Sequence, residues 1–192
     1  MTVIRVCDIT LAAAGLIIGF PCFILLCGLS WSITGSPILV QERVGRNLKL
    51  FSLFKFRTMP VDVPTVPTHQ LNPESLVLSP IAAMMRSLKL DELPQLLNVL
   101  LGDMSMVGPR PALPIQNDVI SAREKLGVLN HRPGITGEAQ ILGIDMSTPE
   151  KLAKADASMM NNLTVKAYFD YIMRTFRIFG RGGRISHKPI KK

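Results

Sequence analysis

The hydrophobic pattern begins with one long apolar segment. No charged residue occurs between Ile9 and Ile33, and as a helix this run is long enough to cross ~30 Å of hydrocarbon. Pro21 lies near its middle, where a proline removes a helical hydrogen bond and kinks or breaks the helix. Two arms of about 12 residues reach ~18 Å each, roughly half-way through a bilayer. The pattern therefore predicts a membrane segment that either crosses as a kinked helix or enters and leaves on one face.

Shorter patterns after this segment predict two strands and a loop. Gly35-Ser36-Pro37 is typical of a turn, the β-prone residues 38–40 follow it, and LFSLFKF at 50–56 predicts a second strand. Residues 60–80 contain five prolines and few large apolar side chains, a composition that predicts a loop.

Helical periodicity returns at Ser79 and continues to Leu101. One apolar stripe follows the i, i+3, i+4 spacing of a helix and consists of Leu93, Leu96, Leu97, Leu100 and Leu101. Pro94 suits the first turn of this helix, where its missing N–H costs little. Asp91 and Glu92 then fall just before or in that turn, near the positive end of the helix dipole. A further helix is expected from Pro114 to Leu126.

The last periodic segment is amphipathic. Its apolar positions repeat every three or four residues and are Val165, Phe169, Ile172, Phe176 and Phe179. Basic residues occupy its other faces, and a basic tail follows. This pattern fits a helix that lies in an anionic headgroup layer, and it equally fits an ordinary helix that faces a core. Together the patterns divide the chain into a membrane segment at 1–34, a larger domain at 35–180 that would hold any catalytic site, and a basic tail at 181–192.

Charge and cysteine usage narrow the partners. The 192 residues carry a formal net charge of +8, which favours a polyanionic partner such as a nucleic acid, an anionic lipid or a phosphorylated substrate. With two Tyr and one Trp, the chain lacks the stacking aromatics of single-strand binders, so we expect no nucleic-acid partner. All three cysteines lie in the first 27 residues, which excludes a disulfide framework in the polar part and fits a reducing, cytoplasmic setting.

Asp91 and Glu92 are the first candidates for chemistry. Adjacent residues on a helix point about 100° apart, so one carboxylate can attack while its neighbour holds a cation or orients the nucleophile. Carboxylates accept phosphoryl groups covalently, and Mg²⁺ commonly uses one or two carboxylates plus substrate phosphates. The structural alternative is a plain N-terminal helix cap.

Basic residues elsewhere provide candidate phosphate ligands. Arg110 lies between two prolines, which restrict the backbone and help to preorganise a guanidinium for bidentate phosphate binding. Lys55 and Arg57 alternate and would share one face of a strand, while Arg86 lies five residues before Asp91. The three histidines show no metal-ligand spacing, and no Walker loop, GxSxG or dinucleotide fingerprint occurs.

Several stretches, taken in order, resemble one known family. They are RVCD at 5–8, GSPILVQERVGR at 35–46, LFSLFKFRTM at 50–59, SLKLDELPQLLNVLLGDMSMVGPRP at 87–111 and RPGITGEAQ at 132–140. In these stretches the chain resembles the bacterial sugar transferases, the small monotopic phosphoglycosyl transferases. The resemblance implies a mainly helical α+β fold with an N-terminal re-entrant membrane helix-hairpin. It also implies a small membrane-associated cytoplasmic catalytic domain with interfacial amphipathic helices, on the cytoplasmic face of the bacterial inner membrane.

The resemblance also implies a reaction. Members of this family move a sugar 1-phosphate from a UDP-sugar to a polyprenyl phosphate, usually undecaprenyl phosphate, releasing UMP and using Mg²⁺. Such a transfer starts the assembly of a polysaccharide, an O-antigen or a glycoprotein glycan. The stretch KLAKADASMMNNLTVKAYFDYI at 151–172 is similar to the branch that handles N-acetylated deoxy-amino sugars. The resemblance implies the UDP-sugar, undecaprenyl phosphate and membrane lipids as partners. It leaves open whether the protein forms a homodimer.

Residue roles follow from the resemblance. Asp91 is the expected nucleophile that forms a phosphosugar-enzyme intermediate, and Glu92 is expected to act mainly with Mg²⁺, for which both carboxylates are candidate ligands. Arg110 is expected to hold the diphosphate. Further substrate-binding candidates are Lys55, Arg57, Arg86, Gln95, Arg132, Asp145 and Asp156. The alternative is a non-enzymatic, membrane-anchored basic adaptor of a glycan-assembly complex, in which the carboxylate pair only caps a helix.

Overall fold

The computed structural model describes residues 2–61 and 79–180. Its α-helices are α1 Thr2–Thr34, α2 Pro80–Ser87, α3 Gln95–Leu101, α4 Asn117–Lys125, α5 Glu138–Ile141, α6 Pro149–Asn161 and α7 Val165–Gly180. Its strands are β1 Ile38–Val44, β2 Leu50–Phe56, β3 Ser105–Val107 and β4 Gly134–Thr136, with short 3-10 turns η1 Arg46–Leu48, η4 Leu90–Glu92 and η5 Val128–Asn130. The mainly helical α+β prediction is confirmed. The expected basic tail and most of the expected proline-rich loop lie outside the described residues.

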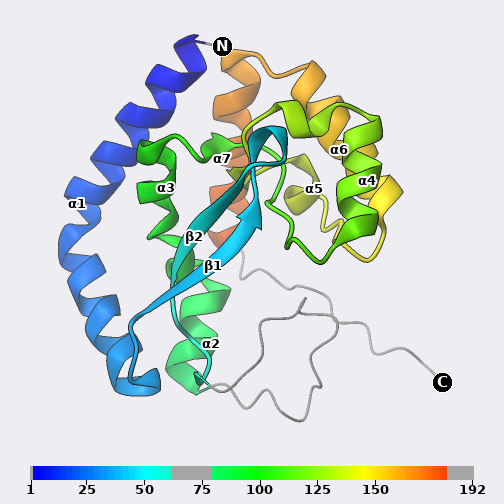
Figure 1. Ribbon diagram of the computed structural model, residues 1–192. Helices are drawn as coiled ribbons and strands as arrows, with labels where there is room; N and C mark the ends of the chain where they lie inside the picture. Colours follow the sequence, from blue (N-terminus) through cyan, green and yellow to red (C-terminus); the bar gives the residue numbers. More distant parts are fainter. Residues whose placement is uncertain (1, 62–78, 181–192) are drawn as a thin grey trace.

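Two small sheets join these helices. β1 and β2 form the predicted pair of strands as an antiparallel ribbon, in register from Ile38 opposite Phe56 to Val44 opposite Leu50. β3 and β4 are short and parallel. In Figure 1 the ribbon crosses the middle of the molecule, with α1 and α3 on one side and α4, α5 and α6 on the other. Between α1 and the ribbon lies α3, and α1 also contacts β3, α7 and α2 directly.

The apolar segment differs in one respect from the expected helix-hairpin. α1 is one continuous helix of 33 residues that contains Pro21, about 50 Å long at 1.5 Å per residue. It bows along the side of the domain (Figure 1) instead of separating into two arms. The missing N–H of Pro21 removes one hydrogen bond, but the bonds of the flanking turns keep both halves helical, so the helix bends without ending.

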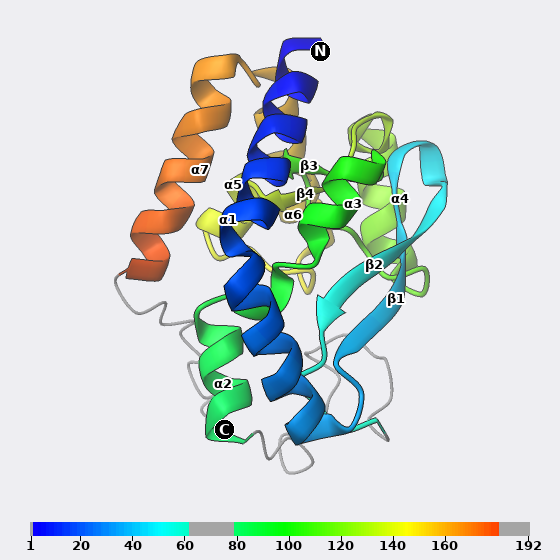
Figure 2. The same ribbon diagram turned by 90° about the vertical axis from the view of Figure 1, so that its left-hand side faces the viewer.

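Both ends of α1 are fastened to the same domain. Near its start, buried Asp8 accepts hydrogen bonds from the hydroxyls of Tyr168 on α7 and Ser105 on β3, each 2.9 Å long. Near its end, the Ser30 hydroxyl donates a 2.9 Å hydrogen bond to the carbonyl oxygen of Pro37. Figure 2 shows α7 beside one half of α1 and α2 beside the other. The two ends of the apolar helix thus lie on one protein body.

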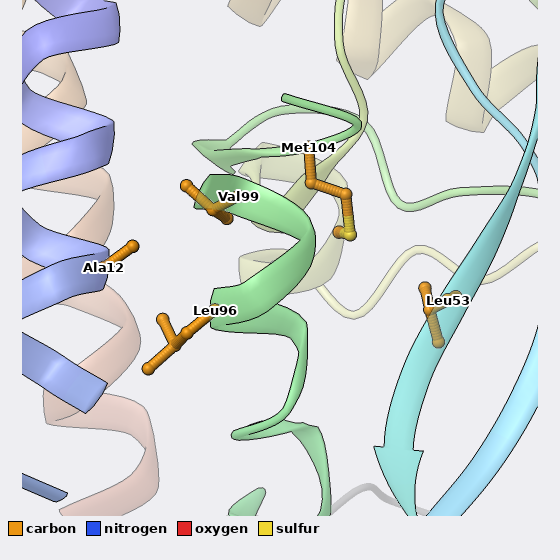
Figure 3. Close-up of a cluster of buried hydrophobic side chains, with 5 residues drawn as sticks. All are labelled: Ala12, Leu53, Leu96, Val99 and Met104. Atoms are coloured by element: carbon orange, nitrogen blue, oxygen red, sulfur yellow. The ribbon is translucent and has the colours of Figure 1, made fainter. Parts of the chain in front are cut away.

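A buried cluster connects α1 to the centre of the fold. Ala12 of α1 packs with Leu96 and Val99 of α3, with Leu53 of β2 and with Met104 (Figure 3). These side chains are at most 8% exposed, and burying a leucine or valine of this kind contributes roughly 1.5–3 kcal/mol. Leu96 of the predicted stripe, with Leu93 and Leu100 packed against the cluster, docks α3 between α1 and the ribbon. The prediction is wrong for Leu97 and Leu101, which are 40% and 69% exposed.

The helix predicted over residues 79–101 is interrupted. α2 ends at Ser87, the 3-10 turn η4 follows, and α3 begins only at Gln95. Lys89 adopts a left-handed conformation with φ of 58°, which turns the chain. Pro94 has no N–H to continue an α-helix from the preceding turn. Asp91 and Glu92 therefore lie on a separate tight turn between two helices.

The last helix presents apolar residues outward as well as inward. Tyr168 is fully buried against β3 and α1, which confirms a core-facing side. Three residues of the predicted stripe, Val165, Phe169 and Phe176, are 41%, 42% and 68% exposed. Ile172 of the same stripe packs against the cluster around Tyr168. The stripe is therefore divided between the core and an exposed apolar side, and a headgroup layer would suit the exposed side.

Candidate active site

The turn η4 places both carboxylates in the interior. Asp91 is 4% exposed and Glu92 7% exposed. Neither side chain caps α3, because the residue at the cap is Pro94 and no side-chain cap hydrogen bond is present there. The alternative in which this pair only caps a helix is therefore wrong. A buried carboxylate that stabilises no helix end needs another source of compensation.

Three basic side chains provide that compensation, two from other parts of the chain and one from the start of the same turn. The Lys55 ammonium of β2 lies 3.7 Å from Asp91 Oδ2. Arg110 donates two hydrogen bonds to Glu92 Oε1, 3.3 Å from Nη1 and 3.2 Å from Nη2. Lys89 Nζ lies 3.5 Å from the same oxygen. The structure thus brings together Asp91, Glu92, Lys55 and Arg110, as predicted.

The two adjacent carboxylates differ in acidity. Burial raises the pKa of Asp91 above its ordinary value of 3.8, the Glu92 charge adds to that rise, and Lys55 opposes it. Burial would also raise the pKa of Glu92, but Arg110, Lys89 and Lys55 together lower it to about 2. Burial lowers the pKa of Lys55 from 10.5, against the pull of the two carboxylates. Glu92 therefore stays ionised. The ionised form of Asp91 is destabilised by its surroundings, which makes Asp91 the more reactive carboxylate of the two.

Two buried polar atoms of this cluster, Asp91 Oδ1 and Arg86 Nη1, have no hydrogen-bond partner among the described residues. The predicted site residue Arg57, which follows β2, also has a buried Nε without such a partner, but no charge interaction connects it to the carboxylates among those that act on their pKa values. The Arg86 charge acts on both Asp91 and Lys55, so this guanidinium belongs to the same cluster. Buried donors and acceptors rarely remain unpaired without a functional reason. Unpaired guanidinium N–H groups suit phosphate oxygens, and an unpaired carboxylate oxygen suits a cation or an attack on phosphorus.

Two basic residues of the cluster were not among the predicted site residues. Lys89 bonds Glu92, and its position is set by the left-handed turn, which no sequence spacing indicated. Burial and the neighbouring Arg110 charge lower the pKa of Arg43 on β1 to about 10, and its Nη1 donates to the carbonyl oxygen of Pro111 at 3.1 Å. The alternation of β1 could have found Arg43. In the observed register, Leu39 pairs with Lys55, so residues 39, 41 and 43 lie on the same face of the ribbon as Lys55.

Other predicted substrate-binding residues have different surroundings. Arg132 donates from Nε to the carbonyl oxygen of Gly102 at 2.8 Å, where it interacts with the C-terminal end of α3 as a basic side chain there often does, and the Arg5 and Arg46 charges act on it. Asp156 is buried and pairs with Arg123. The structure does not bring these two residues to the carboxylate pair.

The remaining two candidates lie at different depths. Gln95 is buried at the first residue of α3, one turn beyond Asp91. Asp145 is exposed and accepts a 2.9 Å hydrogen bond from the backbone N–H of Ser147. Across residues 2–61 and 79–180, no group of three or more His, Cys, Asp or Glu side chains gathers as a metal site. The Asp91–Glu92 pair is thus the oxygen-donor set that this cluster offers to a divalent cation.

The sequence model of the bacterial sugar transferase family matches residues 1–182. Among relatives, a Bacillus subtilis protein provisionally named undecaprenyl-phosphate N-acetylgalactosaminyl 1-phosphate transferase is 39% identical over 64% of this chain and 72% of its own. The UDP-glucose:undecaprenyl-phosphate glucose-1-phosphate transferase of Caulobacter vibrioides is 39% identical over 73% of this chain and 54% of its own. The exopolysaccharide production protein ExoY of Rhizobium meliloti is 32% identical over 88% of this chain and 81% of its own. The chain belongs to the bacterial sugar transferase family and is an enzyme of that class.

Proposed function

We propose that this enzyme transfers a sugar 1-phosphate from a UDP-sugar to undecaprenyl phosphate, releasing UMP and so starting the assembly of a polysaccharide. The observation that carries the proposal is the environment of Asp91. Its carboxylate is buried with a raised pKa, one of its oxygens has no partner among the described residues, and basic groups suited to phosphate lie around it. Two relatives are named as undecaprenyl-phosphate sugar-1-phosphate transferases, which supports the same reaction.

The first step forms a covalent intermediate. A carboxylate oxygen of Asp91 attacks the sugar-linked phosphorus of the UDP-sugar, and the bond between that phosphorus and the bridging oxygen breaks. UMP leaves with the bridging oxygen, and the sugar phosphate remains on Asp91 as an acyl phosphate. Covalent catalysis divides the transfer into two steps, so that one small site handles two large anions in turn.

The second step regenerates the enzyme. A phosphate oxygen of undecaprenyl phosphate attacks the same phosphorus, and the bond between that phosphorus and Asp91 breaks. The carboxylate is restored and the lipid carries the sugar as a diphosphate. Lys55, Arg86 and Arg110 suit this chemistry because fixed cations stabilise the charge that develops on the phosphoryl oxygens.

Mg²⁺ fits the residues present. Asp91 Oδ1 is a buried oxygen without a partner among the described residues, and the neighbouring Glu92 stays ionised because its pKa is about 2. Hard oxygen ligands of this kind, one or two carboxylates completed by substrate phosphates, are what Mg²⁺ prefers. Asp91 and Glu92 would hold the ion, which would supply charge neutralisation for the diphosphate.

The proposed donor sugar is an N-acetylated amino or deoxy-amino sugar. The Bacillus subtilis relative carries N-acetylgalactosaminyl in its name and the Caulobacter relative glucose. A panel of UDP-sugars, each tested with the same acceptor, ranks the candidates by kcat/KM.

The enzyme is associated with a membrane through α1, and we propose that α1 is re-entrant at the cytoplasmic face of the inner membrane. The residues of α1 that project from the domain are apolar, with Ile17, Ile18 and Leu25 each more than 60% exposed. A helix whose two ends bond one protein body, through Asp8 and Ser30, has both ends on the same side of a bilayer. Labelling single cysteines at positions 2 and 190 from each side, in a variant without the native cysteines, tests this topology. Opposite-side labelling contradicts it.

The reaction is tested by UMP release. Purified enzyme with Mg²⁺, the UDP-sugar panel and undecaprenyl phosphate is expected to release UMP and form a lipid-linked diphosphate sugar. The absence of UMP with every sugar and with added metal would contradict the proposal.

A further inference from the structure

The segment that carries Arg110 is fixed in place without forming a helix or strand. Residues 109–112 are irregular, and Pro109 and Pro111 have no N–H to donate. The backbone is nevertheless held, because each of the four carbonyl oxygens of this segment accepts a hydrogen bond. The donors are the N–H of Gly134 for Pro109 (2.9 Å), Nη1 of Arg123 for Arg110 (2.7 Å), Nη1 of Arg43 for Pro111 (3.1 Å) and the N–H of Val44 for Ala112 (2.9 Å). Three elements, β4, α4 and β1, thus hold one short segment.

Arg43 is the donor of this set that also lies in the charged cluster. Burial and the Arg110 charge lower its pKa, and the Glu92 charge raises it, so the three charged groups lie close together. Two guanidinium groups repel each other. Arg43 therefore needs bonds that keep it beside Arg110.

The side chain of Arg43 has such bonds in two directions. Its Nε donates to Gln41 Oε1 at 3.1 Å, and its Nη2 donates to the same oxygen, which belongs to a residue on the same face of β1. Its Nη1 bonds the carbonyl oxygen of Pro111, 68 positions along the chain. All three nitrogens of this guanidinium are thus bonded within the protein. This arrangement suits a brace between two segments better than it suits a ligand of phosphate.

The brace connects two cations of the active site. Arg43 lies on the face of the ribbon that carries Lys55, and the segment at the other end of the brace carries Arg110, which bonds Glu92. The side chain of Arg110 is 39% exposed, so its direction depends on the backbone from which it starts. The bond from Arg43 to Pro111 therefore fixes where the Arg110 guanidinium lies relative to Lys55.

We propose that Arg43 is a positioning residue for Arg110: by holding the carbonyl oxygen of Pro111, it sets the direction in which the Arg110 guanidinium meets the phosphates of the sugar nucleotide. The inference rests on the proposed function, in which Arg110 binds those phosphates, and adds a residue that acts through Arg110 without touching the substrate. A misplacement of about 1 Å in such a site can lower the rate about 100-fold. The role requires that Arg43 affects phosphate binding only while Arg110 is present.

A double-mutant cycle on the whole chain tests this requirement without turnover. Calorimetry measures the binding of inorganic pyrophosphate, with Mg²⁺ present, to wild type, Arg43→Met, Arg110→Met and the double variant, all in phospholipid nanodiscs. Arg43→Met is expected to weaken binding about 5- to 10-fold in the wild-type background, and less than about 1.5-fold when residue 110 is already methionine. Equal losses in the two backgrounds would mean that Arg43 binds phosphate directly or only supports the fold, and would overturn the inference. Unchanged binding by Arg110→Met would overturn it as well.

Gln41→Leu separates the position of Arg43 from its charge. The substitution removes the acceptor that orients the Arg43 guanidinium and changes no charge. Pyrophosphate binding is expected to weaken about two- to threefold, and again only while Arg110 is present. An affinity equal to that of wild type would show that the orientation of Arg43 does not matter, which contradicts the positioning role.

Arg46 provides the matched control. It lies between the same two strands, and its Nε also donates to a distant backbone carbonyl oxygen, that of Asn130, at 3.0 Å. It is not among the charges that act on the pKa of Asp91 or Glu92. Arg46→Met is therefore expected to bind pyrophosphate and to release UMP as wild type does. A loss as large as that of Arg43→Met would assign the effect to the positive charge of the hairpin and exclude a specific role for Arg43.

The binding cycle and the UMP assay separate the inference from the proposed function. If wild-type enzyme releases no UMP but Arg43 and Arg110 are coupled in pyrophosphate binding, the reaction is wrong and the positioning role remains. If UMP release is normal but the two losses of pyrophosphate affinity are additive, the positioning role is wrong and the reaction remains.

Discussion

Two buried carboxylates of this enzyme interact with basic side chains in contrasting ways. Asp156 on α6 accepts hydrogen bonds of 2.9 and 2.7 Å from Nε and Nη2 of Arg123, and the remaining Nη1 of Arg123 donates to the carbonyl oxygen of Arg110 at 2.7 Å. Around Asp91, in contrast, Lys55 is 3.7 Å away, and the buried atoms Asp91 Oδ1 and Arg86 Nη1 have no partner in the described part of the chain. Asp156 is thus bonded within the protein, whereas the Asp91 cluster has polar atoms left to bind a ligand.

The difference distinguishes a structural ion pair from a reactive one. Burial raises the pKa of both Asp91 and Asp156, so acidity alone does not separate them. What separates them is the completeness of their hydrogen bonding. The two regions are also connected, because Arg123 fixes the backbone of Arg110, whose side chain bonds Glu92. The fully bonded Arg123–Asp156 pair thus helps to position Arg110 beside the Asp91–Glu92 cluster.

The largest expected effect is the loss of turnover in Asp91→Asn. An amide of nearly the same shape cannot attack phosphorus, so kcat is expected to fall by at least about 10⁴-fold. Removal of a buried charge with a raised pKa should leave the free energy of unfolding unchanged or increase it. UMP release and thermal unfolding measure the two quantities. UMP release at the wild-type rate would exclude Asp91 as the nucleophile.

Substitution in the Arg123–Asp156 pair is expected to lower the free energy of unfolding. Arg123→Met leaves Asp156 buried and unpaired, and is expected to lower the free energy of unfolding by about 3–5 kcal/mol. The double variant Arg123→Met/Asp156→Leu should recover most of that loss, because it removes the orphaned charge as well. Denaturant unfolding measures all three proteins. If the single variant is as stable as wild type, this pair is not the structural support described above.

Arg110→Lys tests whether the carboxylate cluster needs the guanidinium of Arg110 or only its charge. Lysine keeps the positive charge but lacks the planar guanidinium whose two N–H groups both reach Glu92 Oε1 and which suits bidentate phosphate binding. We expect kcat/KM for the UDP-sugar to fall about 10- to 100-fold, while the melting temperature stays within a few degrees because Arg110 is partly exposed. A wild-type kcat/KM would show that only the charge of Arg110 matters.

The smallest expected effect is on the pH profile. In the proposed reaction Asp91 must be deprotonated to attack, and since its pKa is raised, the acid limb of kcat/KM should lie above pH 3.8. Lys55 must be protonated to stabilise phosphate, and since its pKa is lowered, the alkaline limb should begin below pH 10.5. Lys55→Arg is expected to move the alkaline limb upward and to leave the acid limb in place. An unchanged alkaline limb in this variant would assign it to another group.

Local patterns were sufficient to predict much of this structure. The two strands of the ribbon, the apolar α1 and the carboxylate pair with Lys55 and Arg110 all follow from short-range alternation, periodicity or motif. The pairing of Arg123 with Asp156 joins residues 33 positions apart, and no periodicity connects them. The position of Lys89 depends on a single left-handed residue. The interaction of Arg132 with the end of α3 depends on how β3 and β4 pair. No local sequence pattern predicts that pairing, so the position of Arg132 could not be predicted from the sequence.

The central claim is that Asp91 carries the sugar phosphate between the two substrates. The most direct measurement is mass spectrometry of acid-quenched enzyme after incubation with the UDP-sugar and Mg²⁺ in the absence of a lipid acceptor. A sugar-phosphate adduct is expected on the peptide that contains Asp91, formed with release of UMP and lost when undecaprenyl phosphate is added. An enzyme that turns over with both substrates, yet releases no UMP and forms no adduct without the acceptor, would contradict it.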